Sequence, residues 1–70
     1  MEMRPVSSRN VAAVGYDPAT QELRVRFNSG ATYSYRGVPE STYRAMMRSG
    51  SIGSFIAAHV KAQFPFSKTG

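Results

Sequence analysis

The chain has 70 residues, with nine Lys or Arg, four Asp or Glu, no Cys and a formal net charge of +5. This length fits one domain with a small core, and the lack of cysteine excludes disulfides, thiolate metal sites and a thiol nucleophile. No apolar run approaches the roughly 20 residues that a membrane-spanning helix needs, so we expect a soluble cytoplasmic protein. Because the net charge is positive, we expect its partners to be anionic.

The first part of the chain predicts a lead-in, a strand and a turn. Residues 1–5 contain Pro5 and show no periodicity, so we expect a loose lead-in followed by one domain over residues 6–70. Residues 10–16 are apolar and tolerate β-structure. The strand stops at residues 17–20, where Asp17 can accept a hydrogen bond from its own backbone and Pro18 presets φ for a turn.

The next two strands are predicted to form a hairpin. Residues 23–27 and residues 31–36 alternate apolar and polar side chains. A three-residue loop pairs Val25 with Tyr33 and keeps both apolar sets on one face, whereas a two-residue loop would separate them. Gly30 then takes the left-handed position of that loop.

Two helices follow the hairpin. Pro39 and Glu40 suit a helix start, and a second helix is predicted over residues 52–64, which Pro65 ends. The apolar stripe of the first helix contains Tyr43, Met46 and Met47, and that of the second contains Ile52, Phe55, Ile56, His59, Val60 and Phe64. The expected fold class is α+β: a three-stranded antiparallel β-meander followed by two α-helices packed on one face.

The polar face of the hairpin carries the candidate binding residues. Arginine side chains suit phosphate, and hydroxyl groups add hydrogen-bond donors. The same charges are equally typical of a solvated sheet face that resists aggregation. The candidate nucleic-acid-binding residues on this face are Arg24, Arg26, Arg36, Thr32 and Ser34.

The aromatic residues have two interpretations. Tyr33 and Tyr35 alternate with Leu23, Val25 and Phe27, which favours burial with the hydroxyls at the rim; on a sheet beside arginines they would alternatively stack bases. Phe64 and Phe66, on either side of Pro65, are expected to close the core against the first strand, or to form an exposed docking segment instead.

The sequence offers little chemistry for catalysis. The lone histidine, His59, is expected to be partly buried on its helix stripe, and the four carboxylates are not spaced for a metal or for paired acid–base work. We therefore expect no enzyme activity, cofactor or metal. Residues 50–53 match a G-x-x-G phosphate clamp, but helix capping and chain reversal explain them better.

The order and spacing of these pieces resemble the KTSC domain, a small bacterial and phage module also found at the C-terminus of some lysyl-tRNA synthetases. The resemblance spans roughly residues 6–68, and its central Tyr-x-Tyr motif is matched by Tyr33 and Tyr35. The other matching pieces are Ser8, Val11, residues 14–17, residues 23–27, Ser29, Gly30, Val38, Pro39, Tyr43 and residues 64–66. One departure is that residues 55–58 are wholly apolar, where such domains usually carry an aromatic and an asparagine.

Two functions remain open. The resemblance and the charge favour a non-enzymatic module that binds RNA or another nucleic acid through the arginine-rich sheet face. The alternative is a protein-interaction module of phage type, which docks on an acidic host protein or forms a homodimer through an exposed strand edge.

Overall fold

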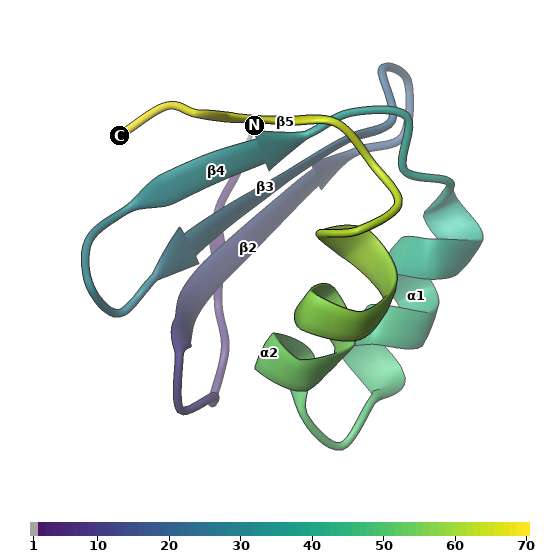
Figure 1. Ribbon diagram of the computed structural model, residues 1–70. Helices are drawn as coiled ribbons and strands as arrows, with labels where there is room; N and C mark the ends of the chain where they lie inside the picture. The colour runs from purple at the N-terminus through teal and green to yellow at the C-terminus, as the bar shows by residue number, and fades with distance from the viewer. Residues whose placement is uncertain (1) are drawn as a thin grey trace.

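The computed structural model describes residues 2–70, which form a sheet with two helical segments packed on one of its faces (Figure 1). The strands are β1 (Arg4–Pro5), β2 (Val11–Asp17), β3 (Glu22–Phe27), β4 (Thr32–Tyr35) and β5 (Phe66–Lys68). The helical elements are α1 (Glu40–Arg48), α2 (Ile52–Phe55) and η1 (Ile56–Val60), a π-helix that continues α2. No helix within residues 2–70 is long and apolar enough to cross a membrane.

The sheet has five antiparallel strands in the order β1-β2-β3-β4-β5, which corrects the predicted three-stranded meander. The α+β class with helices on one face is confirmed. Arg4 pairs with Val14 and Pro5 with Ala13, within the predicted loose lead-in. At the other edge, Tyr35 pairs with Phe66. Both edge strands have three residues or fewer, which is too short for apolar alternation to be recognised.

The central hairpin has the predicted register. Val25 pairs with Tyr33, and the Phe27 N–H donates to the Ala31 carbonyl over 2.9 Å. Gly30 has φ of +97°, the left-handed conformation that the three-residue loop requires. The turn before β3 also follows the prediction, because the Ala19 N–H donates to the Asp17 carboxylate over 2.9 Å.

Helix α1 follows Pro39, whose φ of −65° leads directly into the first turn. The predicted stripe is confirmed: Met46 is fully buried, and Tyr43 and Met47 pack against the core. Tyr43 also stacks on Tyr16 of β2, with ring centroids 4.7 Å apart and planes only 8° apart. This stacked pair holds the helix against the sheet.

The second helical segment is shorter than predicted and changes its winding. The Lys61 N–H donates to the Ile56 carbonyl over 2.8 Å, an i to i+5 bond that closes a wider π-turn. Ile56 and Val60 remain buried, but His59 rotates out of the stripe and is exposed, with its ring 4.9 Å from that of Phe55. The prediction of a partly buried His59 is therefore wrong, because it assumed 3.6 residues per turn.

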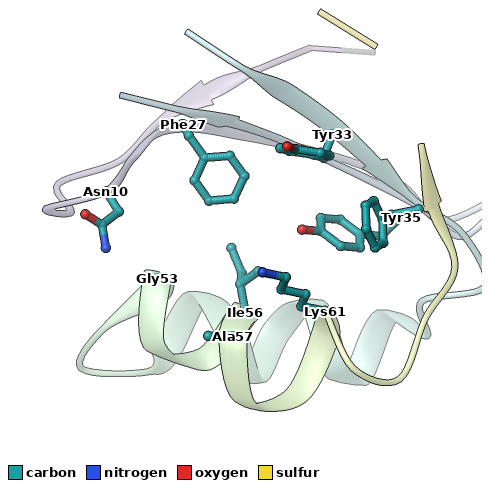
Figure 2. Close-up of a pocket in the computed structure, with 9 residues that line it drawn as sticks. Asn10, Phe27, Tyr33, Tyr35, Gly53, Ile56, Ala57 and Lys61 are labelled. Carbon is teal, nitrogen blue, oxygen red and sulfur yellow. The ribbon is translucent and has the colours of Figure 1, made fainter. Parts of the chain in front are cut away.

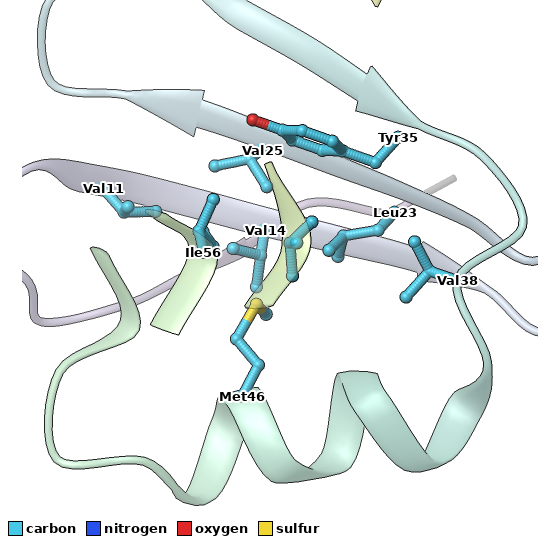
Figure 3. Close-up of a cluster of buried hydrophobic side chains, with 9 residues drawn as sticks. Val11, Val14, Leu23, Val25, Tyr35, Val38, Met46 and Ile56 are labelled. Carbon is cyan, nitrogen blue, oxygen red and sulfur yellow. The ribbon is translucent and has the colours of Figure 1, made fainter. Parts of the chain in front are cut away.

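The core lies between the sheet and the two helical segments (Figure 3). Phe64 packs against it as predicted, but Phe66 lies on β5 beside β4 and is 49% exposed, so it does not close the core against the first strand. The buried cluster consists of Val11, Val14, Leu23, Val25, Tyr35, Val38, Met46, Ile56 and Val60.

Candidate functional site

The polar face of the hairpin, which points away from the helices, brings the predicted binding residues together. Arg24 pairs with Ser34, and Arg26 pairs with Thr32. Because side chains alternate along strands, these four residues share one face, and Arg36 follows two positions after Ser34. We call this surface the outer face, defined by Arg24, Arg26, Thr32, Ser34 and Arg36.

An acidic residue interrupts the outer face. The Glu22 Oε2 atom lies 2.8 Å from the Arg24 Nη2 atom and accepts a hydrogen bond from the Ser34 hydroxyl over 2.6 Å. These two hydrogen bonds, first that of Ser34 and then that of Arg24, lower the pKa of the Glu22 carboxyl below its ordinary value. Arg24 and Ser34 thus already have Glu22 as a partner, and Ser34 is also buried.

Arg26 and Arg36 are the more available cations of the outer face. Both side chains are exposed, and neither belongs to an ion pair with a group of residues 2–70. Arg36 also lines a shallow hollow of about 330 Å³, together with Glu22 and Arg24, among others. Thr32 is half-buried, and its carbonyl accepts a hydrogen bond from the Thr69 N–H over 2.7 Å.

Tyr33 and Tyr35 lie on the opposite face, toward the helices, as their alternation predicts. Tyr35 is only 3% exposed, and burial raises the pKa of its phenol, so the hydroxyl stays protonated at neutral pH. Tyr33 is partly buried and makes edge-on contacts with Phe27 and Phe66, each with ring centroids 5.6 Å apart. The Tyr-x-Tyr motif therefore belongs in part to the core.

The same side of the sheet contains a pocket that sequence reasoning missed (Figure 2). It has a volume of about 420 Å³ and lies between the sheet and the α2–η1 segment. Its walls come from Asn10 before β2, Phe27 of β3, Tyr33 of β4, Ile56 of η1 and Phe66 of β5. We call it the aromatic pocket. Only the fold brings together segments so far apart in the sequence.

The remaining candidates are the carboxylates, His59 and the G-x-x-G loop. Across residues 2–70, no group of three His, Cys, Asp or Glu side chains could hold a metal ion. In the G-x-x-G loop, the Ser51 hydroxyl accepts a hydrogen bond from the Ser54 N–H over 3.3 Å and caps α2. Capping is the role that the sequence favoured for this loop.

The fold and its outer face define a small α+β domain with a five-stranded antiparallel sheet and an excess of exposed cations. Residues 7–64 match the model of the KTSC domain, and the chain belongs to this family. The crystal structure of a KTSC domain protein from Yersinia pestis has a TM-score of 0.94 and 36% identity, and covers 99% of this chain and 97% of that one.

Three relatives place the domain in different proteins. A protein of Tsukamurella paurometabola is 44% identical over 62 residues, which cover 89% of this chain and 92% of the relative. An uncharacterised protein of Stutzerimonas stutzeri is 38% identical, with 76% and 75% covered. A lysine–tRNA ligase of Nostoc sp. is 31% identical over 83% of this chain but only 10% of the ligase.

Proposed function

We propose that this domain is a non-enzymatic nucleic-acid-binding module that prefers RNA and has weak sequence specificity. The observation that carries the proposal is the presence of two exposed cations on the outer face, Arg26 on β3 and Arg36 directly after β4, both free of ion pairs with residues 2–70. Guanidinium groups at such positions neutralise phosphates and release counterions. Arg24 contributes less, because Glu22 already neutralises it.

Two further facts support this proposal. The net charge of +5 on 70 residues attracts any polyanion and raises the rate of encounter. In addition, the Nostoc relative is named a lysine–tRNA ligase, so a region similar to this chain occurs in a protein whose name includes an RNA. Weak sequence specificity follows from the phosphate contacts, which carry no sequence information directly.

Fluorescence anisotropy with a labelled single-stranded RNA and a tRNA at low salt tests the proposal. The test variant is R26A/R36A, and the matched control is R44A/R48A, which removes the same charge from α1. We expect saturable binding by the wild type, weaker binding by R26A/R36A and a smaller effect of the control. The slope of log K against log salt should become shallower by about 0.7 for each phosphate that the variant no longer neutralises.

Two results would overturn the proposal. One is the lack of saturable binding up to about 100 μM protein at low salt, since non-specific binders usually reach that range. The other is an equal loss in R26A/R36A and R44A/R48A, because diffuse charge rather than the outer face would then account for binding. A matched single-stranded DNA tests the preference for RNA, which equal affinities would contradict.

A second candidate is a protein-interaction module, favoured by the exposed Phe66 on the edge strand β5. Such an edge can accept a strand from an acidic partner or from a second copy. Size-exclusion chromatography with light scattering measures self-association directly. A strict monomer across micromolar to millimolar concentration would exclude the homodimer.

A further inference from the structure

The aromatic pocket has an aromatic ring on one side and an aliphatic side chain on the other. In Figure 2, Tyr33 presents a face of its ring to the hollow, and Ile56 of η1 points toward it from the helix side. Phe27 and Phe66 stand at 77° and 74° to the Tyr33 ring and form side walls. This geometry leaves a slot for a flat, apolar group that stacks on Tyr33.

Polar groups point into the same hollow. Figure 2 shows the Tyr35 hydroxyl and the Lys61 ammonium directed toward its centre, with the Asn10 amide at one end. The two ion pairs formed among residues 2–70, Arg24–Glu22 and Arg44–Glu40, leave Lys61 without a carboxylate partner. Both hydrogen-bond donors and acceptors are thus available to a ligand.

The charge at the pocket has one sign. No carboxylate of residues 2–70 lines it, whereas Lys61 does, and Lys68 pairs with Tyr33 across the β4–β5 ladder and so projects to the same face. An aromatic cage for a cationic ligand would need the lysine to be absent or a carboxylate to be present. The pocket therefore favours a flat ligand that carries a negative group.

We propose that the aromatic pocket binds one nucleotide, with its base stacked on Tyr33 and its phosphate near Lys61 and Lys68. The Asn10 amide and the Tyr35 hydroxyl are placed to bond the edge of the base. A volume of about 420 Å³ is within the range of small-molecule pockets. The choice of ligand class rests on the proposed function, but the pocket lies on the opposite side of the sheet from Arg26 and Arg36.

The binding test uses the wild-type domain and adenosine and uridine 5′-monophosphates, followed by two-dimensional NMR of the backbone amides. Ala57 lines the pocket and is exposed on η1, so A57W should fill the pocket without disturbing the core; Ala58, also exposed but outside the pocket, gives the matched control A58W. We expect shifts centred on Tyr33 and Phe66. Binding should be lost in A57W and retained in A58W.

Two more variants separate the base from the phosphate. Y33L should weaken mononucleotide binding by about tenfold or more, which is the size of a base–aromatic stacking contact. K61A should weaken binding of the monophosphate by roughly fivefold but leave binding of the nucleoside unchanged, as expected when one exposed charge is removed. Circular dichroism of each variant verifies that it is folded.

Several outcomes would overturn the nucleotide proposal. These are the absence of saturable shifts up to about 10 mM nucleotide, well beyond even weak non-specific affinities, or equal binding by wild type and A57W. Inorganic phosphate that reproduces all the shifts would show an anion contact without a base. Tighter binding of N-acetyl-phenylalanine than of either nucleotide would assign the pocket to a peptide carboxylate instead.

The same variants distinguish this proposal from the proposed function. If only the proposal for the outer face is wrong, R26A/R36A and the wild type bind mononucleotides equally. In that case neither protein binds long RNA with the expected salt dependence. If only the pocket fails, long RNA is still bound in a manner sensitive to R26A/R36A, and A57W has no effect on any ligand.

Discussion

At the scale of single residues, Glu22 connects two side chains of the outer face. It accepts a hydrogen bond from the buried Ser34 hydroxyl and pairs with Arg24, and these contacts favour its charged form. A lowered pKa means that the contribution of Glu22 to stability is fully present above its ordinary value of 4.5 and is lost as the pH falls through the folded-state pKa below that value.

We therefore predict that S34A destabilises the domain at neutral pH and much less in acid. Loss of a hydrogen bond to a charged group should lower the free energy of unfolding by about 1–2 kcal/mol at neutral pH. The difference from wild type should shrink in acid, as the pH falls below 4.5 and through the lowered folded-state pKa of Glu22. Urea denaturation at both pH values measures it.

The matched control for this variant is S67A. Ser67 pairs with Ser34 across the β4–β5 ladder, but its side chain is exposed, whereas the Ser34 hydroxyl is buried against Glu22. We expect almost no change in stability from S67A at either pH. An equal loss in S34A at neutral and acid pH would contradict the assignment of the effect to the charged carboxylate.

The contact between Glu22 and Arg24 is consistent with a pattern that is visible in the sequence. Alternation along β3 puts Glu22 on the same face as Arg24, two positions away. The arginines share the face that the alternation predicts, and Glu22 lies on it with them. Periodicity predicts which way a side chain points, whereas its partner depends on rotamers that the sequence does not specify.

At the scale of elements, the two methionines of α1 pack on the sheet to different depths. Met46 is 0% exposed and belongs to the central cluster, whereas its neighbour Met47 packs only at the margin. We predict that M46A costs about 2–5 kcal/mol and M47A clearly less, because the cost of truncation rises with the cavity left behind. Thermal unfolding followed by far-ultraviolet circular dichroism compares the two.

A loss of this size approaches the whole stability of so small a domain, so M46A can unfold entirely. The variant M46L keeps most of the side-chain volume and should cost less than about 1.5 kcal/mol. Equal losses for M46A and M47A, or a larger loss for M47A, would contradict the packing described for α1.

Some secondary-structure elements could be predicted from the sequence pattern and others could not. The β3–β4 hairpin was predictable in register because two alternating strands and a glycine with positive φ allow only one phase. The edge strands β1 and β5 have too few residues to alternate. The π-turn of η1 was not predictable from a 3.6-residue period, and His59 within it lies at the surface instead of on the predicted stripe.

At the scale of the whole molecule, the aromatic pocket forms only when the chain is folded. Asn10, Phe27, Tyr33, Ile56 and Phe66 come from five separate segments that local periodicity cannot bring together. Phe27 and Tyr33 were predicted on the core-facing side and lie there. The hollow beside them is closed by residues of β5 and of the α2–η1 segment, which the chain brings to the same side of the sheet.

We therefore expect the chain up to residue 65 to fold without β5, and β5 to be needed mainly for ligand binding. Every residue of the buried cluster lies between Val11 and Val60, and the family match ends at residue 64, before β5 begins. We predict that a chain ending at Pro65 still unfolds cooperatively. Its melting temperature should fall by several degrees, since a loss of about 1 kcal/mol corresponds to about 4–8 °C in a domain of this size.

The same truncation should abolish most mononucleotide affinity, because it removes Phe66 from the pocket wall and Lys68 from its rim. A chain ending at Lys68 keeps β5 and serves as the control, with melting temperature and affinity close to those of the full chain. Calorimetry for stability and NMR titration for binding check both effects. Loss of cooperative unfolding would show that β5 belongs to the folding unit, and unchanged affinity would show that the nucleotide binds elsewhere.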